Sequence, residues 1–338
     1  MQYVSLGVSG IQVSPIFLGG MSFGEPDPNQ HQWTVDPDTT RSIIAKAIDL
    51  GINAIDTANC YANGSSETYI GEALKALGVN RENVVLASKV YFNEGHSSAE
   101  AIKREIEGSL RRLGTEYLDL YILHRFDYGT PIEESMQALD DLVKEGKVRA
   151  LGASEMYGYQ YHNLQKAAHA NGWTPLSSLQ CHYNLLYRED ERELLPVARQ
   201  YGALPTPYSP LASGHLARST WDSDSLRGTT DAVVRDKYDA ARNQDQPIIE
   251  RVAHLAQKHG VSMAQIALSW QWSHGASSPI VGCSSPERVE EAVKALDVHL
   301  EEGDIQYLES PYVAHELVGP LARPGEKHLA GTTKPEHR

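Results

Sequence analysis

The feature that most constrains the fold is a repeated alternation of short apolar runs with segments of helical periodicity. The runs lie at residues 16–20, 53–57, 84–90, 118–124, 148–154, 176–181, 203–208 and 279–282. Helical spacing of apolar residues is clear between them at residues 39–50, 99–113 and 132–144. Several runs are apolar throughout, which is typical of strands in a sheet covered on both faces. Eight such strands, seven of them followed by helices, predict a (β/α)8 TIM barrel.

The main alternative to a barrel is an open, doubly wound sheet that binds a dinucleotide. That fold places G-x-G-x-x-G at its first strand–helix turn. In this chain the first such turn reads Gly-Gly-Met-Ser-Phe-Gly at residues 19–24, and the motif is found nowhere else in the sequence. The barrel is therefore the better prediction.

Three segments stand outside the strand–helix repeat. Residues 3–14 are expected to form an N-terminal β-hairpin with Ser9 and Gly10 in its turn. Residues 217–246 form a long polar insertion after the seventh strand, and the chain ends in a polar tail at residues 321–338. We expect both segments to be mobile. We expect residues 1–320 to form a single barrel domain with large loops at its C-terminal face.

Charge and composition disfavour several classes of partner. The chain has 338 residues, and its 30 basic and 44 acidic side chains give a net charge of −14 with no basic cluster, which disfavours nucleic acid. The sequence contains no run of about eighteen apolar residues, so we expect no membrane-spanning helix. Its first residues lack a signal-peptide pattern. Three widely spaced cysteines, Cys60, Cys181 and Cys283, fit a reducing compartment. We expect a cytoplasmic protein, a monomer or a small homo-oligomer, that binds neither nucleic acid nor membrane.

The candidate catalytic residues lie at strand ends, where barrel enzymes place their chemistry. Asp56, Lys89 and His124 lie at or near the ends of the second, third and fourth predicted strands. Tyr61 lies in the loop after the second. Each alone has an ordinary explanation: helix capping for the aspartate, exposure for the lysine, packing for the tyrosine and a structural role for the histidine. Together they would face one mouth of the barrel, which favours a joint catalytic role.

An Asp–Lys–Tyr chain is suited to proton donation. A free phenol has a pKa near 10, and a lysine ammonium about 4 Å away stabilises the phenolate by about 4 kcal/mol at an effective dielectric near 20. We therefore expect Lys89 to lower the pKa of Tyr61, less the cost of desolvation. Asp56 would keep Lys89 charged, and His124 would orient a carbonyl oxygen beside the phenol. The pattern predicts an acid catalyst for the reduction of carbonyls.

Other chemistries find less support in the sequence. There is no His-x-His pair, no pair of histidines four residues apart and no Cys-x-x-Cys, so we expect no metal. Neither Gly-x-Ser-x-Gly nor a Walker-type Gly-Lys-Ser/Thr occurs. Schiff-base chemistry at Lys89 stays open as an alternative, but the neighbouring Tyr, His and Asp residues fit hydride transfer more economically.

The motifs that contain these residues resemble those of the aldo-keto reductase family over nearly the whole chain. Ile-Asp-Thr-Ala-Asn-Cys-Tyr at residues 55–61 is similar to the family's D-T-A-x-x-Y motif, and the S-E-x-x-x-G-x-A-L pattern follows at residues 66–74. Ala-Ser-Lys at residues 87–89 and Asp-Leu-Tyr-Ile-Leu-His at residues 119–124 carry the family's lysine and histidine. Residues 146–154 resemble its G-K-[VI]-R-x-[IL]-G-x-S signature.

The resemblance implies a carbonyl reductase with the catalytic tetrad Asp56, Tyr61, Lys89 and His124, in which Tyr61 is the general acid. The implied cofactor is NADPH/NADP+, with NADH as a weaker alternative. The protein would bind four parts of this cofactor with residues at or after the strand ends: the nicotinamide amide (Ser154, Gln180), the nicotinamide ring (Gly20, Met21, Asp56, Tyr208), the pyrophosphate (Ser209, Pro210, Leu211, Ser213, Gly214) and the adenosine 2′-phosphate (Gly282, Ser284, Arg288, Glu291). A guanidinium suits a phosphate because it donates two parallel hydrogen bonds.

Several positions depart from the family pattern. Glu155 follows Ser154 where many members carry Asn, and Ala62 follows the tetrad tyrosine where Gly is usual. Ala292 stands where many members have an adenine-binding Asn, and Gly282 stands where some have a phosphate-binding Lys. The last two changes suggest weaker adenosine binding or some tolerance of NADH.

Two further segments narrow the resemblance to a microbial branch. Residues 180–188 and His-Arg-Phe-Asp at residues 124–127 resemble aryl-alcohol-dehydrogenase-like and versiconal hemiacetal acetate reductase-like enzymes of secondary metabolism. The implied substrate is a small aldehyde or ketone, aromatic or polyketide-derived. Tyr91 and Arg125 adjoin tetrad positions and are candidate substrate residues, the first by stacking on planar compounds and the second by contact with an anionic or phenolic group. The alternative is a cofactor-sensing subunit of the potassium-channel beta type with little turnover.

Overall fold

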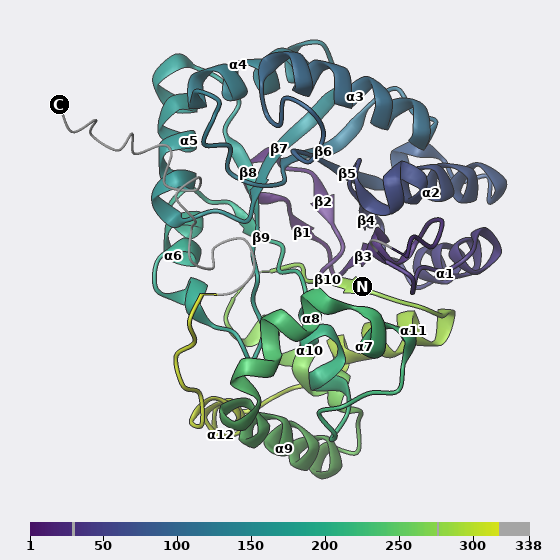
Figure 1. Cartoon of the computed structure of the whole chain (residues 1–338), viewed down its shortest axis with the longest axis vertical. Helices are drawn as coiled ribbons and strands as arrows, with labels where there is room; N and C mark the ends of the chain where they lie inside the picture. The colour runs from purple at the N-terminus through teal and green to yellow at the C-terminus, as the bar shows by residue number, and fades with distance from the viewer. Residues whose placement is uncertain (29–30, 276, 318–338) are drawn as a thin grey trace.

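The strands form a closed barrel. The structure, a computed structural model, describes residues 1–28, 31–275 and 277–317. One parallel sheet has the order β10-β3-β4-β5-β6-β7-β8-β9. Its strands are β3 (Phe17–Gly19), β4 (Ala54–Asp56), β5 (Val85–Val90), β6 (Leu118–Leu123), β7 (Val148–Ser154), β8 (Leu176–Gln180), β9 (Leu204–Pro205) and β10 (Ile280–Gly282). The two end strands meet where the Ser278 N–H donates to Pro205 O at 3.0 Å and the Ile280 N–H to Pro207 O at 2.8 Å. The predicted (β/α)8 barrel is confirmed (Figure 1).

The seventh strand of the repeat is shorter than predicted. The apolar run at residues 203–208 yields only β9, because Pro205 and Pro207 have no N–H to donate to a ladder. The residues between and after the prolines still bond to β8 and to the residue that follows it, since the Thr206 N–H donates to Leu179 O at 2.8 Å and the Tyr208 N–H to Cys181 O at 2.9 Å. The segment therefore stays in the barrel wall up to Tyr208.

Helices surround the barrel (Figure 1). They are α1 (Pro37–Asp49), α2 (Ser65–Ala76), α3 (Ala99–Leu113), α4 (Ile132–Lys144), α5 (Gly158–Asn171), α6 (Leu194–Gln200), α7 (Leu226–Thr230), α8 (Ala232–Tyr238), α9 (Arg242–His259), α10 (Met263–Ser273), α11 (Pro286–Lys294) and α12 (Glu302–Glu309). The helices α3 and α4 have the predicted bounds. Helix α1 begins earlier than its apolar spacing suggested, because Asp36 caps it by accepting the Thr39 N–H at 2.9 Å and Pro37 occupies its first turn.

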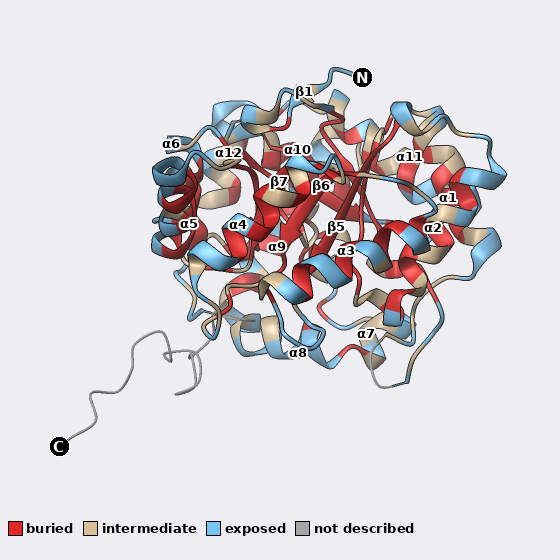
Figure 2. Ribbon diagram, turned by 90° about the horizontal axis from the view of Figure 1, so that it is seen from above, coloured by how far each residue is buried: buried red, intermediate tan, exposed pale blue. Residues whose placement is uncertain are grey.

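The predicted hairpin closes one end of the barrel. Strands β1 (Val4–Ser5) and β2 (Gln12–Val13) pair antiparallel, with Gly10 in the left-handed region at φ 74°. Leu6 and Val13 are fully buried and belong to the cluster inside the barrel, with Phe17, Ala54, Val85, Ala87, Leu120, Ile122, Ala150, Leu204 and Ile280. The hairpin lies at the end opposite α7 and α8 (Figure 2). A ligand site is therefore left to the C-terminal ends of the strands.

The polar insertion at residues 217–246 is built of helices rather than loop. It contains α7, α8 and the first turn of α9, which its polar composition concealed. Trp221, Val234 and Tyr238 are buried and anchor it to the barrel. The predicted tail at residues 321–338 lies outside the described residues. Within those residues, no helix is long and apolar enough to cross a membrane.

A glycine at the contact between α2 and α3 gives a test of this packing. A Cβ added to Gly71 would lie 2.5 Å from Leu113 O and 2.9 Å from Arg112 O, both backbone atoms that cannot rotate away. We expect Gly71→Ala to lower the free energy of unfolding by about 1–3 kcal/mol in urea denaturation. The control is Gly303→Ala in α12, where an added Cβ meets nothing within 4 Å. It should be neutral or slightly stabilising, and equal losses in both variants would contradict the packing argument.

Candidate active site

A fully buried lysine ammonium organises the predicted tetrad. Lys89, near the end of β5, is 0% exposed. Its Nζ donates to Asp56 Oδ1 at 2.6 Å, to Thr57 O at 2.8 Å and to the Tyr61 hydroxyl at 3.1 Å. These three acceptors use all three N–H groups of the ammonium. Although burial alone lowers the pKa of Lys89, Asp56 and Tyr61 outweigh it and raise that pKa above its usual value. Lys89 therefore stays charged.

The phenol of the half-buried Tyr61 is a weaker acid than expected from its sequence neighbours. Burial raises its pKa above the usual value, and the Lys89 ammonium offsets only part of the shift, to which Asp56 also adds. Desolvation disfavours the phenolate more than the one shared ammonium stabilises it. Tyr61 is thus protonated at neutral pH. Because its oxygen accepts a hydrogen bond from Lys89, its own proton is available to a neighbouring acceptor.

His124 completes the group as a neutral imidazole. It follows β6, and its ring meets the Tyr61 ring edge-on with centroids 5.8 Å apart. Burial first, and then the charges of Lys89 and Arg125, hold its pKa well below the usual value. Its Nδ1 lies 3.9 Å from the Cys60 sulfur, and burial raises the pKa of that thiol to about 11. The structure thus brings the four predicted catalytic residues together.

Backbone strain is concentrated beside this site. Among the described residues, the non-glycine positions with positive φ are Ala62, Asn63, His96, Glu155, Ser209, Ala212 and Ser213. Apart from Asn63 and His96, each directly follows a candidate site residue or is one. Strained backbone of this kind is costly and is kept where side chains must be aimed. Ala62, which stands where the family usually has Gly, lies in the left-handed region at φ 46°. Its Cβ adds to the strain at this position.

The predicted nicotinamide contacts adjoin the tetrad. Gln180, at the end of β8, donates from Nε2 to Asp56 Oδ2 at 3.0 Å. Ser154, at the end of β7, is buried, and its Oγ has no hydrogen-bond partner among the described residues. At Gly20 an added Cβ would lie 2.9 Å from Asp56 O, so only glycine fits this approach. Met21 is half-buried in the following turn.

The ring of Tyr208 is packed on one face against other aromatic rings. His182 stacks on it at a centroid distance of 5.2 Å and an interplanar angle of 12°. Tyr187 stacks on His182 at 4.4 Å and 15°, and His315 of the C-terminal segment meets Tyr187 edge-on at 6.1 Å. The stack fixes Tyr208 as a rigid platform.

The predicted phosphate contacts fall on two separate segments. The pyrophosphate set, Ser209, Pro210, Leu211, Ser213 and Gly214, follows β9 and enters a 3-10 turn (Ala212–Ala217). The 2′-phosphate set, Gly282, Ser284, Arg288 and Glu291, follows β10 and continues into α11. Gly282, Ser284 and Arg288 are exposed, and the Arg288 guanidinium is 2.9 Å from Glu291. The guanidinium is therefore oriented but accessible.

The two predicted substrate residues differ in their placement. Tyr91 follows β5, but its ring stacks on His96 at 4.7 Å rather than on the tetrad. The residue against His124 is Phe92, whose ring meets the imidazole edge-on at 4.9 Å. The Arg125 guanidinium lies over the Phe92 ring, 4.6 Å from its centroid. Phe92 and Arg125 thus form the wall beside His124.

Three residues at this mouth were missed by the sequence argument. The sequence favoured Tyr91 as a substrate residue instead of its neighbour Phe92. Side chains alternate in direction along a strand, but beyond its end this alternation does not determine which ring points into the barrel mouth. His182 lay in a quoted motif without a role. Lys237 of α8 donates from Nζ to the Tyr208 hydroxyl at 3.2 Å, and no local pattern signals it because its position depends on how the insertion packs.

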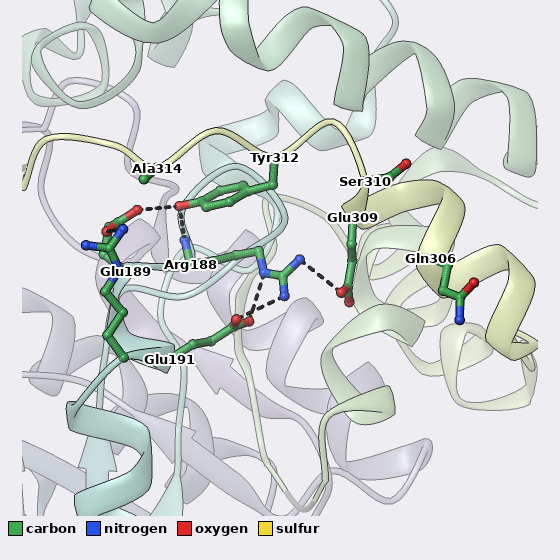
Figure 3. A pocket seen from close by; sticks show the side chains of 9 residues that line it. Arg188, Glu189, Glu191, Gln306, Glu309, Ser310, Tyr312 and Ala314 are labelled. Carbon is green, nitrogen blue, oxygen red and sulfur yellow. Dashed lines mark hydrogen bonds and ion pairs between the residues drawn. The ribbon is translucent and has the colours of Figure 1, made fainter.

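The structure also has a polar groove, which Figure 3 shows from close by. It has a volume of about 690 Å³ and is lined by Arg188, Glu189, Glu191, Arg192, Gln306, Glu309, Ser310, Tyr312 and Ala314, none of them a predicted site residue. Arg188 pairs with Glu191 at 2.8 Å and with Glu309 at 3.1 Å, and the Tyr312 hydroxyl donates to Glu189 at 2.8 Å. These contacts tie the segment after α12 to the loop after β8, which is a structural role.

Comparison with known proteins identifies the family of this chain. The family model described as the aldo/keto reductase family matches residues 15–312. The chain is 38% identical to a versiconal hemiacetal acetate reductase of Aspergillus parasiticus, over 97% of this chain and 100% of that protein. It is 37% identical to a putative aryl-alcohol dehydrogenase of Schizosaccharomyces pombe (94% and 98%) and 37% identical to an aldo-keto reductase of Alternaria alternata (94% and 93%).

Both the family match and these relatives span nearly the whole barrel, including every residue of the predicted tetrad. Members of the family generally use nicotinamide cofactors. The chain therefore belongs to the aldo/keto reductase family, and it is an oxidoreductase that acts on the carbonyl groups of small molecules.

Proposed function

We propose that this enzyme reduces an aldehyde or ketone to the alcohol with NADPH, and that Tyr61 is the general acid. The observation that carries the proposal is the set of three hydrogen bonds from the buried Lys89 ammonium to Asp56, Thr57 O and Tyr61. It leaves one phenolic proton aimed away from the lysine, beside a neutral imidazole. This is the donor pair that a carbonyl oxygen needs as it gains negative charge.

The proton route uses only residues of this chain. The carbonyl oxygen accepts hydrogen bonds from Tyr61 and His124, which orient it and polarise its double bond. When bound, a reduced nicotinamide supplies the hydride that adds to the carbonyl carbon. The Tyr61 proton passes to the oxygen, and the resulting phenolate is stabilised by the Lys89 ammonium 3.1 Å away. The alcohol leaves with both hydrogens.

The cofactor residues fit a nicotinamide. The buried Ser154 hydroxyl, which has no hydrogen-bond partner within the part of the chain that the structure describes, offers a donor and an acceptor to a carboxamide. The Tyr208 ring, supported by His182, offers a platform for a planar ring. Ser154 and Gln180 would hold the amide, Tyr208 the ring, the segment after β9 the pyrophosphate, and Arg288 the 2′-phosphate.

The relatives support turnover rather than the cofactor-sensing alternative, because their names are those of reductases and dehydrogenases. An aryl-alcohol dehydrogenase and a hemiacetal acetate reductase among them support an aromatic or polyketide-derived carbonyl compound as substrate. The Phe92 ring beside His124 adds a surface on which such a compound can pack.

The proton donor is tested by Tyr61→Phe. We expect kcat/KM for aromatic aldehydes to fall by about 10²–10⁴-fold, while the Kd of NADPH, measured by fluorescence titration, stays nearly unchanged. The matched control is Tyr121→Phe, which removes a buried hydroxyl that has no hydrogen-bond partner among the described residues. It should keep its activity. Retention of most activity in Tyr61→Phe would overturn the tetrad assignment.

The pH dependence follows from the two shifted groups. Tyr61, with its pKa raised, stays protonated as the pH rises, and His124, with its pKa lowered, stays neutral as the pH falls toward 6. We expect kcat/KM for reduction to be flat from about pH 6 to about pH 9. The oxidation of the alcohol needs phenolate, so its kcat/KM should rise about tenfold per pH unit over the same range. A reductive profile with a limb near pH 6.5 would contradict a neutral His124.

Cofactor preference is tested by Arg288→Gln. Losing the guanidinium should weaken NADPH by about tenfold or more and leave the Kd of NADH unchanged, since only NADPH carries the 2′-phosphate. Lys294→Gln is the control, because Lys294 lies on the same helix and pairs with Glu290 at 3.1 Å in the same way that Arg288 pairs with Glu291. Equal losses for both cofactors would place Arg288 outside the phosphate site.

A further inference from the structure

A line of charged side chains crosses the mouth of the barrel beside the tetrad. Arg125, next to His124, lies with its Nε 3.8 Å from Glu155 Oε2. The Glu155 carboxylate lies beside the Tyr208 hydroxyl, where it contributes, after burial, to raising the pKa of that phenol. Lys237 reaches the same hydroxyl from α8 at 3.2 Å. Four separate segments of the chain thus bring two cations, one carboxylate and the Tyr208 phenol together.

The cations of this line are not fully compensated. Arg125 Nε and Glu155 Oε2 are both buried, yet neither has a hydrogen-bond partner among the described residues. The half-buried Lys237 donates to a neutral phenol, and burial, opposed by Glu155 but assisted by Arg125, lowers its pKa. A partly buried cation with only a distant or neutral partner is stabilised when an anion joins it.

The other charged groups near Lys237 do not change this balance. Asp231 is occupied by Arg227, at 3.3 Å. Asp190 faces Glu155, and burial first, with Glu155 next, raises the pKa of its carboxyl to about 7, so it carries only part of a negative charge at neutral pH. The mouth is therefore locally positive in a chain whose net charge is −14.

An aromatic wall joins this positive region to the reacting atoms. The Phe92 ring lies between the two, edge-on to His124 at 4.9 Å and beneath the Arg125 guanidinium at 4.6 Å. Phe92 is 43% exposed, so its ring is accessible to a ligand. A planar substrate with its carbonyl at Tyr61 and His124 would pack along Phe92 toward Arg125.

We propose that Arg125 and Lys237 form an anion-binding subsite for the substrate, so that the enzyme selects aromatic carbonyl compounds that carry a carboxylate. The inference rests on the proposed reductase function and assigns it a substrate class. The carboxylate would accept hydrogen bonds from the Arg125 guanidinium, whose side chain is 36% exposed, and from the Lys237 ammonium, which otherwise donates to the neutral Tyr208 hydroxyl. Glu155 would hold the two cations in place while leaving one positive charge for the ligand.

The test compares carboxybenzaldehydes (2-, 3- and 4-isomers) with their methyl esters at saturating NADPH. Wild type should favour at least one acid over its ester by about tenfold or more in kcat/KM, because a hydrogen bond to a charged group contributes more than one to a neutral ester. Arg125→Gln and Lys237→Gln should each reduce this ratio about tenfold, and raised salt should reduce it in wild type. A wild-type ratio near one for every isomer would overturn the proposal.

Two control variants separate charge from fold. Arg125→Lys keeps the cation and should restore much of the preference that Arg125→Gln loses. Arg235→Gln removes an exposed cation from the same helix as Lys237, where its guanidinium bonds to Thr229 O at 3.0 Å, and should leave the ratio unchanged. If Lys237→Gln weakens the Kd of NADPH and leaves the acid-to-ester ratio intact, Lys237 binds the cofactor and the subsite as proposed is wrong.

A binding measurement separates the subsite from the reductase function. Calorimetry of wild type with NADP+ compares 4-(hydroxymethyl)benzoate and its 2- and 3-isomers with their methyl esters, which requires no turnover. If no aldehyde is reduced but an acid binds about tenfold better than its ester and loses this advantage in Lys237→Gln, the subsite stands and the reductase proposal fails. Equal binding of every acid and its ester would overturn the subsite even in an active reductase.

Discussion

The site depends on one electrostatic constraint, the burial of a lysine ammonium. A cation removed from water is tolerated only where oxygen atoms replace its hydration. Lys89 meets that requirement with a carboxylate, a backbone carbonyl and a phenol. The two strands that carry Lys89 and Asp56 are neighbours in the sheet, with Asp56 in register with Ala87. The reactive geometry is therefore a direct product of strand pairing.

The loops at the mouth accept conformational strain in order to aim the remaining side chains. Glu155 at φ 50° turns away from the β7 direction immediately after Ser154, and Ser209 at φ 52° does the same after Tyr208. Each deviation costs free energy that the rest of the barrel must supply. The hairpin and the buried interior cluster provide that rigidity at the opposite end. Stability and chemistry are thus divided between the two ends of the barrel.

Sequence reasoning was most successful where a local pattern has only one structural reading. Apolar periodicity located α3 and α4 to the residue, and motif spacing brought Asp56, Tyr61, Lys89 and His124 to one rim. It was less successful where the outcome is a balance of long-range terms. The pKa of Tyr61 depends on how much desolvation opposes Lys89, and the place of Lys237 depends on the packing of a polar insertion. Neither the pKa of Tyr61 nor the position of Lys237 can be predicted from the residues that adjoin it in the sequence.

The aromatic stack beneath Tyr208 has a practical consequence for anyone who modifies this protein. Its last ring, His315, belongs to the segment that follows α12 and is held by the buried Asp245 at 2.9 Å. The C-terminal segment is thereby coupled mechanically to the Tyr208 ring, whereas the N-terminus lies with the hairpin at the far end (Figure 2). An affinity tag or fusion partner is therefore better tolerated at Met1. Truncating the chain before His315 would remove the ring that packs against Tyr187 at the end of the stack.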